Sequence, residues 1–303
     1  MPPVESLPSS APPAAPRVHL VDATYELFRS WFGAPPARAP DGREVGAVRG
    51  LAATLLRLVR DEGATHVGCA TDHVVRSFRN DLYAGYKTDE GVPPALLAQF
   101  ELAEELMRAL GFVVWAMVDF EADDALATAA ARYAPLASQV LVASPDKDLA
   151  QCVRGTHVVQ LDRRKGLVLD EAAVLAKHGV PPVSIPDWLA LVGDSADGYP
   201  GLPGWGAKSA AAVLRVHGHL EDIPADPAEW RVAVRGAPRL AATLAAGRDE
   251  AALYKTLATL RLDAPVPEPL AELAWQGARP ELRELAPALG LEGLLARVPL
   301  WSR

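Results

Sequence analysis

Short apolar runs rich in β-branched residues alternate, in the first half of the chain, with longer segments whose apolar residues recur at helical spacing. The strand-length runs are residues 17–22, 65–70, 112–118, 139–143 and 156–161. Between them, residues 45–59, residues 94–110 and the Ala- and Leu-rich run from residue 121 have helical spacing. Strands that alternate with helices predict an α/β fold with a mostly parallel central sheet flanked by helices.

The strand-like runs stop beyond residue 181, and helical stretches broken by Gly and Pro follow. These stretches are residues 184–193, 207–217, 227–234, 237–246, 249–260 and 280–296. The pattern predicts an α/β domain at residues 17–183, a linker near residues 180–186, and an all-α region at residues 184–303. The Pro-, Ser- and Ala-rich opening predicts a disordered tail at residues 1–16.

Composition limits the classes of protein that fit. Half of the 303 residues are hydrophobic. The formal net charge of −8 argues against a protein that coats nucleic acid nonspecifically, but it does not exclude a local basic patch. No apolar run approaches the roughly 18 residues of a membrane span, and the opening residues do not resemble a signal peptide. Cys69 and Cys152 match no metal-ligand spacing, which favours reduced thiols and a cytoplasmic protein.

Acidic residues follow the four best strands. Asp22, Asp72, Glu121 and Asp146 stand at or just after the strand ends, and Asp123, Asp124 and Asp148 lie beside them. Helix capping explains one acid at such a place. It does not explain the additional ones. Parallel strands deliver their carboxyl ends to one edge of the sheet, where so many carboxylates need cations to coexist. Ligands that are all oxygen suit Mg²⁺ or Mn²⁺, and two such ions would promote phosphodiester cleavage.

Two further motifs lie at the start of the helical region. Asp194 and Asp197 follow an apolar helix, and the local alternative to a metal site is an Asx-rich turn. Gly201, Gly204 and Gly206 then form a tight turn that leads into a small-residue helix carrying Lys208. Backbone N–H groups at such a turn can bind a phosphate, whereas the alternative is a plain interhelical turn.

A loop between the second and third strands mixes cations with aromatic rings. Its residues are Arg76, Phe78, Arg79, Tyr83, Tyr86 and Lys87. Cations with stacking rings are typical of sites for single-stranded nucleic acid, and the alternative is a solvated loop with anchoring aromatics.

Taken together, these motifs resemble those of the bacterial 5′→3′ exonuclease and flap endonuclease family, whose fold also forms the N-terminal domain of DNA polymerase I. The segments LVDATYELFRS, SFRNDLYAGYK, FEADDALATAA, SPDKDLAQ, LALVGDSADGYPGLPGWGAKSAA and LATLRLD occur in the family's order and spacing. The resemblance extends from residue 17 to about residue 263. It implies a PIN-like 5′ nuclease fold followed by a helix–hairpin–helix region.

The resemblance also implies roles for the residues named above. All the family's carboxylates are present and would hold two or more divalent ions: Asp22, Asp72, Glu121, Asp123, Asp124, Asp146, Asp148, Asp194 and Asp197. Lys87 matches the family's active-site lysine, which helps neutralise the scissile phosphate, and Arg79 matches its neighbouring arginine. The turn at residues 201–206 matches the helix–hairpin–helix that binds duplex backbone and a K⁺ ion.

The chain departs from the family pattern at three positions. Ala23 replaces a glycine, Gly198 replaces an asparagine, and Glu90 stands where the family has an arginine. The expected function is a monomeric, metal-dependent 5′ nuclease acting on 5′-flap, nicked or branched DNA, with RNA–DNA primer ends as further substrates. A non-catalytic DNA-junction binder and an RNA-directed nuclease are the alternatives. Retention of every acid argues against the first, and the helix–hairpin–helix region against the second.

Overall fold

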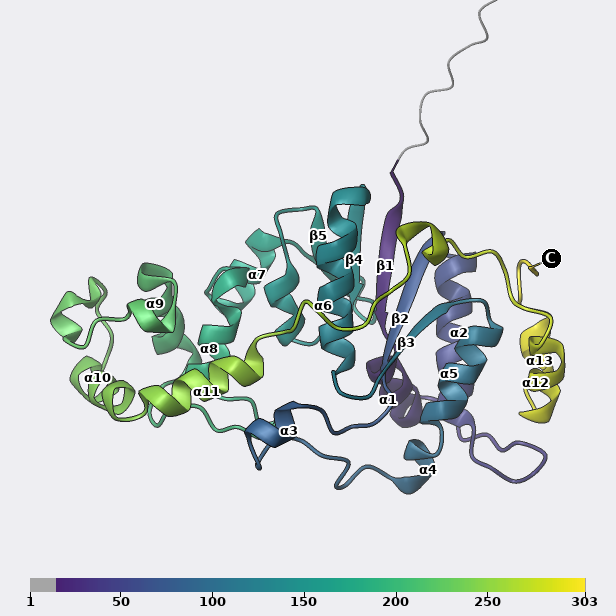
Figure 1. Cartoon of the computed structure of the whole chain (residues 1–303), viewed down its shortest axis with the longest axis horizontal. Helices are drawn as coiled ribbons and strands as arrows, with labels where there is room; N and C mark the ends of the chain where they lie inside the picture. Colours follow the sequence, from purple (N-terminus) through teal and green to yellow (C-terminus); the bar gives the residue numbers. More distant parts are fainter. Residues whose placement is uncertain (1–14, 303) are drawn as a thin grey trace, which may run out of the picture.

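A six-stranded sheet forms the centre of the larger domain (Figure 1). The computed structural model describes residues 15–302, so most of the predicted tail at residues 1–16 lies outside it. The strands are β1 (Arg17–Asp22), β2 (His66–Asp72), β3 (Val113–Met117), β4 (Gln139–Ala143), β5 (Val158–Asp162) and β6 (Leu167–Leu169). Their order is β3-β2-β1-β4-β5-β6, and only β6 pairs antiparallel. The predicted α/β class and mostly parallel sheet are confirmed.

Strand β1 is the centre of this sheet because it pairs with both β2 and β4. Leu20 is in register with Gly68 on one side and Val142 on the other. The chain runs outward from β1 to β3 and then returns to β4, which makes a topological switch point between β1 and β4. Ligand sites in open α/β sheets lie at such points, beyond the carboxyl ends of the strands.

Helices cover both faces of the sheet. One face packs against α1 (Ala23–Gly33), α2 (Gly46–Arg60) and α5 (Phe100–Ala109), and the other against α6 (Ala122–Tyr133). Successive residues of a strand point to opposite faces, so Leu20 joins the core beneath α6 while Val21 joins the core beneath α2. Both side chains are fully buried, which explains why β1 is a continuous apolar run.

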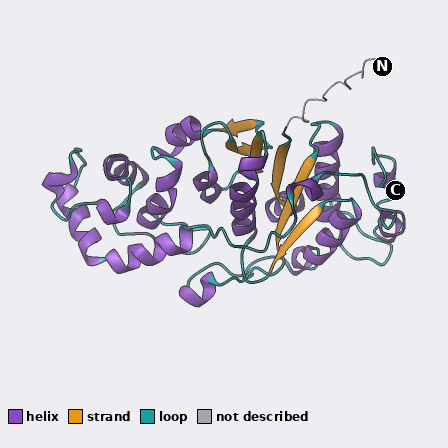
Figure 2. Ribbon diagram, turned by 45° about the horizontal axis from the view of Figure 1, so that its top comes forward, coloured by secondary structure: helices purple, strands orange, loops and turns teal. Residues whose placement is uncertain are grey.

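The second part of the molecule is helical. It contains α7 (Glu171–His178), α8 (Ile185–Val192), α9 (Ala207–His217), α10 (Ala237–Ala246) and α11 (Arg248–Ala258). Its core includes Leu189, Trp205, Trp230 and Leu240, all at most 5% exposed. The strands lie in one half of the molecule, and helices and loops fill the other half (Figure 2).

Residues 264–302 do not belong to that helical core. They return along the α/β domain, carrying α12 (Leu282–Ala288) and α13 (Glu292–Leu295) past α5 (Figure 1). The Trp275 ring stacks on Phe112 with centroids 6.1 Å apart, and its indole N–H donates to the carbonyl of Leu110 at 2.8 Å. We call this segment the C-terminal strap. The expected single helical region at residues 184–303 therefore does not match the packing, and we assign the strap to the α/β domain.

Several predicted helices differ from the observed ones. The helix expected at residues 94–110 is divided into α4 (Pro94–Leu97) and α5. The division lies beside Gln99, whose buried side-chain oxygen accepts the N–H of Val48 at 3.1 Å. The stretch at 280–296 forms two short helices, with Pro287 near the end of the first. The stretch at 227–234 contains only a 3₁₀ turn, and α1, α7 and β6 were not predicted.

The remaining elements are short. They are α3 (Arg79–Leu82), η1 (Ala134–Leu136), η2 (Asp148–Cys152), η3 (Pro182–Ser184), η4 (Leu220–Asp222), η5 (Pro227–Trp230) and η6 (Leu270–Leu273). None of the helices in residues 15–302 combines the length and apolar character needed to cross a bilayer.

Candidate metal centre and nucleic-acid interface

The carboxyl edge of the sheet gathers acids from separate strands. Asp22 ends β1 and Asp72 ends β2. The Ser144 hydroxyl, which follows β4, donates to Asp22 Oδ2 at 2.8 Å. The backbone N–H of Ala122, at the start of α6, donates to Asp72 Oδ1 at 2.8 Å. These hydrogen bonds fix the acids of β1 and β2 to the segments that follow β4 and β3.

Burial and mutual repulsion raise the pKa values of this group of acids, because little positive charge lies nearby to offset them. Burial raises the pKa of Asp22 to about 7, and repulsion from Asp72 and Asp146 adds to the shift. Asp123 has a pKa well above its usual value, first through burial and then through repulsion from Asp146 and Asp22. Asp146 itself is exposed, and its Oδ1 accepts the N–H of Asp148 at 3.0 Å. Such a group favours either bound protons or a cation.

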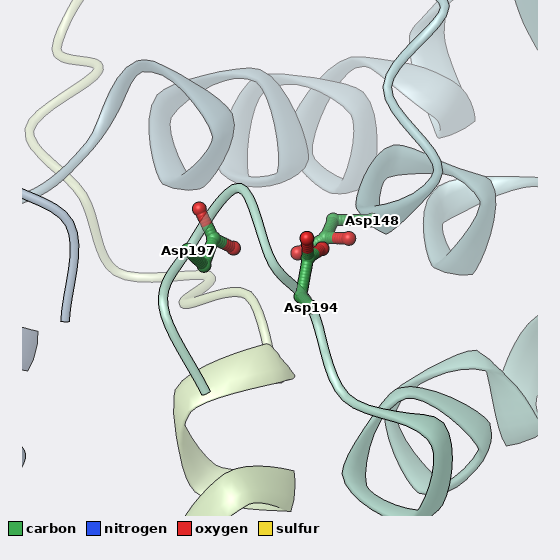
Figure 3. Close-up of side chains that lie close together, drawn as sticks. All are labelled: Asp148, Asp194 and Asp197. Atoms are coloured by element: carbon green, nitrogen blue, oxygen red, sulfur yellow. The ribbon is translucent and has the colours of Figure 1, made fainter. Parts of the chain in front are cut away.

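Three further acids come together where the sheet edge meets the helical region (Figure 3). Asp148 begins η2 after β4, whereas Asp194 and Asp197 lie in the connection between α8 and α9. Each offers one carboxylate oxygen, and these atoms lie within 4.8 Å of one another. Asp194 Oδ1 also accepts the N–H of Ala196 at 2.9 Å, so the Asx turn expected as the alternative is present in the same cluster.

Asp148 provides the test of whether this cluster fits a metal. Its Oδ1 is buried and accepts no hydrogen bond from the described residues. Burial raises the pKa of Asp148 well above its usual value, and Asp146, Asp197 and Asp194 raise it further. An unpartnered buried oxygen among repelling carboxylates is costly unless a cation binds there. All the donors are oxygens, so the residues fit a hard divalent ion.

Two lysines reach into the acidic cluster. The Lys87 ammonium lies 2.8 Å from Glu121 Oε2 and 3.1 Å from Asp197 Oδ1. Burial alone would lower the pKa of Lys87, but Glu121 and Asp197 raise it well above its usual value. Through Glu121 and Asp197, Lys87 therefore connects its own loop before α4 with the start of α6 and with the helical region. The ammonium of Lys147 pairs with Asp194 Oδ2.

Sequence reasoning did not identify Lys147. The available signal was its place between Asp146 and Asp148, because a cation between two clustered acids reduces their repulsion. Ser77 was also missed, although its hydroxyl donates to Glu121 Oε1 at 2.6 Å. Burial alone would raise the pKa of Glu121, yet Lys87 and Arg79 together hold it below its usual value.

Asp124 and Arg79 have a different environment from the other predicted site residues. Asp124 is fully buried and Arg79 is 1% exposed. Two guanidinium nitrogens of Arg79 donate to the two oxygens of Asp124, both at 2.8 Å. Those oxygens also accept the N–H groups of Glu121 at 3.0 Å and Arg261 at 2.9 Å. The expected metal contact of Asp124 and catalytic role of Arg79 do not fit this arrangement, because neither group faces the cluster unpaired.

The aromatic residues of the loop anchor it to the protein. Phe78 packs edge-on against Phe120 with centroids 6.1 Å apart, and Tyr83 packs in the same way against Tyr254 at 5.8 Å. Tyr86 is 3% exposed, and its hydroxyl donates to Glu121 Oε2 at 3.3 Å. The structure therefore favours the alternative of anchoring aromatics, and base stacking on Tyr86 is excluded by its burial. Arg76 is exposed beside this loop.

The glycine turn between α8 and α9 has a closed side and an open side. Gly201 has a φ of +69°, and a Cβ there would lie 2.3 Å from the backbone N of Gly193. Gly204 has a φ of +85° and is exposed, and a Cβ there would meet nothing closer than 3.6 Å. Gly206 and Lys208 are also exposed. The open side of this turn is accessible to a ligand.

The departure at Gly198 has a structural explanation. Its φ is +89°, and a Cβ at this position would lie 2.2 Å from the carbonyl oxygen of Gly85. The N–H of Lys87 donates to the carbonyl of Asp197 at 3.0 Å, so the two loops pack backbone to backbone. Gly198 therefore allows the loop that carries Lys87 to approach the acidic cluster closely.

The parallel sheet and its flanking helices form a PIN-like nuclease fold, and sequence comparison identifies the family. The family model described as "5'-3' exonuclease, N-terminal resolvase-like domain" matches residues 17–179. A second, "5'-3' exonuclease, C-terminal SAM fold", matches residues 180–281. The chain belongs to the 5'-3' exonuclease family.

Curated relatives include both long and short proteins. DNA polymerase I of Rhizobium leguminosarum is 36% identical over 256 residues, covering 82% of this chain and 25% of that protein. DNA polymerase I of Bacillus caldotenax is 34% identical over 285 residues, covering 92% of this chain and 32% of that protein. The 5'-3' exonuclease of Aquifex aeolicus is 31% identical over 207 residues, covering 68% of this chain and 71% of that protein. The chain thus spans a quarter to a third of those two polymerases.

Solved structures confirm the fold. The T5 5'-exonuclease with bound divalent zinc ions has a TM-score of 0.65 at 19% identity, covering 80% of this chain and 89% of that one. Flap endonuclease-1 from Methanococcus jannaschii has a TM-score of 0.57 at 14% identity, covering 94% of this chain and 91% of that one.

Proposed function

We propose that this chain is a metal-dependent 5′-3′ exonuclease and 5′-flap endonuclease that hydrolyses DNA phosphodiesters. The observation that carries the proposal is the unpartnered, buried oxygen of Asp148 within a cluster of acids from the sheet edge and the helical region. The zinc ions bound to the T5 5'-exonuclease support a metal site, and the catalytic core of Rad2 in complex with DNA substrate supports DNA as the ligand.

The acids divide into two groups that would each hold a divalent ion. The sheet-edge group is Asp22, Asp72, Asp123 and Asp146, and the junction group is Asp148, Asp194 and Asp197. When bound, Mg²⁺ or Mn²⁺ would lower the pKa of water for attack on phosphorus and stabilise the leaving oxygen. The first group lies at the carboxyl edge of the sheet and the second at the junction with the helical region, and this division supports a two-ion arrangement.

The chain's own cations complement this chemistry. The ammonium group of Lys87 lies between Glu121 and Asp197, where it would balance the charge of the scissile phosphate. Ser77 and Tyr86 donate to Glu121 and so orient the carboxylate that holds Lys87. We assign the Asp124–Arg79 pair a positioning role, because it ties the start of α6 to α3, in the loop that carries Lys87. Arg76 and the open side of the glycine turn, with Lys208, would contact DNA backbone.

The pathway and location form part of the same proposal. The polymerase I relatives support a role in DNA replication or repair, with RNA–DNA primer ends among the substrates. The Aquifex relative, a 5'-3' exonuclease of which 71% is covered, supports activity without a polymerase. We further propose a monomer in the cytoplasm.

The test is cleavage of a 5′-flap oligonucleotide and of a linear duplex with a labelled 5′ end. Cleavage of both is expected in Mg²⁺ or Mn²⁺, and EDTA should abolish it. The matched control is the same DNA without a free 5′ end. Metal-independent cleavage would contradict the proposed site. Tight flap binding with no cleavage in any divalent ion would instead identify a non-catalytic junction-binding protein.

A further inference from the structure

Four exposed cations lie on the helix that follows the glycine turn and around the start of α10. They are Lys208 on α9, and Arg231, Arg235 and Arg239 at the approach to α10 and in its first turn. All four are exposed, and within residues 15–302 none of their side chains forms a hydrogen bond or an ion pair. Exposed, unpaired cations are available to an external anion.

Acids are excluded from the segments that supply these cations. Residues 198–220 and 230–248 contain no Asp or Glu, although the whole chain carries a net charge of −8. Of the four acids in residues 221–229, Glu221 pairs with Lys255 and Asp226 caps η5, whereas Asp222 and Glu229 are exposed. Residues 198–248 still carry six Lys and Arg against these four acids. The local charge of this surface is therefore opposite to that of the molecule, which favours binding of a polyanion.

The turn and the start of α10 form one rigid unit. The nearest atoms to a Cβ at Gly204 would be those of the Arg239 guanidinium, at 3.6 Å, so this cation lies directly beside the turn. The buried Trp205 indole donates to the carbonyl of Leu240 at 3.2 Å and packs against Trp230 at a centroid distance of 5.7 Å. Because both rings are buried, the unit can present a fixed pattern of cations.

The chemistry of this surface selects double-stranded over single-stranded DNA. Binding of single strands relies on exposed aromatic rings that stack on bases. Here Trp205 is 5% exposed and Trp230 is fully buried, and no large aromatic side chain of the described helical region is exposed. Cations without stacking rings contact phosphates independently of base sequence.

We propose that the start of α10, through Arg235 and Arg239, forms a second duplex-backbone contact beside the glycine turn. α10 lies at the far end of the helical region from the sheet (Figure 1). This surface would hold duplex at a distance from the cleaved bond, and so it sets the length of duplex that the protein requires. The inference rests on the proposed function, because it extends the same DNA interface.

The test measures binding of a blunt duplex and of one of its strands in EDTA, over a range of salt concentrations. Arg235→Gln and Arg239→Gln should each weaken duplex binding several-fold at low salt and lower the slope of log K against log salt by about 0.9. Arg239→Lys should keep the wild-type slope. The control is Arg297→Gln, the same change at an exposed arginine of the strap, which should bind as the wild type does.

A longer duplex separates this surface from the glycine turn. The wild type should bind a duplex of two helical turns more tightly than one of a single turn, and the doubly substituted protein should lose that advantage. Unchanged slopes in both arginine variants, or an equal loss on the single strand, would overturn the proposal. Binding in EDTA is independent of cleavage, so an inactive wild-type protein would overturn only the proposed function.

Discussion

The carboxylate side chains at the carboxyl edge of the sheet have three different environments. Asp22 and Asp148 are buried and Asp123 is half-buried, all three have little compensating charge, and each has a raised pKa. Glu121 faces Lys87 and Arg79 and has a lowered pKa. Asp124 is paired with Arg79 in the interior. Substitution to the isosteric amide should therefore have different consequences at different acids.

The first prediction compares Asp124→Asn with Asp146→Asn. Asp124→Asn removes the bidentate counter-ion of the buried Arg79 guanidinium and leaves only Glu121, at 3.3 Å, which should destabilise the fold by about 3–5 kcal/mol. Asp146→Asn keeps an Oδ1 that accepts the N–H of Asp148, so the fold should persist while turnover falls by orders of magnitude. Urea unfolding and flap cleavage measure the two effects. A stable but inactive Asp124→Asn protein would show that Asp124 acts in the chemistry.

The second prediction concerns the pH dependence of stability without metal. Because the pKa of Asp22 is about 7 in the folded state, well above its unfolded value, the folded protein retains a proton that the unfolded chain releases. Stability should therefore be greatest below a pH of about 4 for this group and fall as the pH rises toward about 7. The raised pKa values of Asp72, Asp123 and Asp148 act in the same direction, whereas Glu121 opposes it.

Melting in EDTA at several pH values tests this expectation. The melting temperature should fall from about pH 5 to pH 8, and Mg²⁺ should raise it most at the higher pH, where the carboxylates are ionised. Asp22→Asn should flatten the dependence in EDTA. A melting temperature that rises with pH through this window would contradict the repulsion among these acids.

At the scale of elements, the hairpin between α8 and α9 combines a structural glycine with an accessible one. Gly201 packs against the backbone of Gly193, and Leu202 N donates to the carbonyl of Leu191 at 2.9 Å. Gly204 adopts a similar positive φ, but nothing crowds it. The closed side holds the two helices together, and the open side faces solvent.

The third prediction uses a matched pair of substitutions at Gly204. Asparagine tolerates a positive φ, so Gly204→Asn should fold and bind DNA with a modest loss. Gly204→Asp is nearly isosteric but places a negative charge beside phosphate, so its affinity should fall further, and similarly for every DNA sequence. Binding at low salt, with circular dichroism as a check on folding, measures the difference. Equal affinities of the two variants would mean that the open side does not face DNA.

Gly201→Ala provides the structural contrast. A Cβ 2.3 Å from the Gly193 nitrogen forces the backbone to move, and the positive φ adds strain, so the loss of stability should exceed that of Gly204→Asn.

At the scale of the whole molecule, the C-terminal strap completes the α/β domain. Leu282 and Ala286 are fully buried in the core that also contains α2 and α5. Earlier in the strap, the carbonyl of Glu268 accepts the Tyr133 hydroxyl at 2.7 Å, and its carboxylate accepts the Trp115 indole N–H at 2.7 Å. The strap therefore contacts both faces of the sheet domain after the chain has passed through the helical region.

The fourth prediction tests this integration by Leu282→Ala. Removing a fully buried leucine from a packed core should cost about 2–5 kcal/mol. Leu300→Ala, in the same strap but at a side chain that is 50% exposed, should have a much smaller effect. Urea unfolding of both variants supplies the comparison. Equal and negligible effects would mean that the strap is an independent appendage.

The sequence alone determined the five parallel strands, although not β6, and the positions of the acids that follow them. The predicted strand at residues 139–143 coincides with β4, and the one at 17–22 with β1, because a buried parallel strand must be apolar on both faces. Asp22 and Asp72 could be placed at one edge because parallel strands share a direction. Family resemblance added the residues of the junction between sheet and helices.

Only the tertiary structure decided which of the predicted site residues are paired within the protein and which are available to a ligand. Asp124 pairs with Arg79, which lies 45 positions earlier in the chain, and that contact separates it from the other acids. Tyr86 became an anchor because α6 places Glu121 against its hydroxyl. The strap returned to the sheet domain because its leucines complete a core formed by distant helices. Each outcome depends on long-range packing, whereas hydrophobic periodicity records only which side of an element is buried.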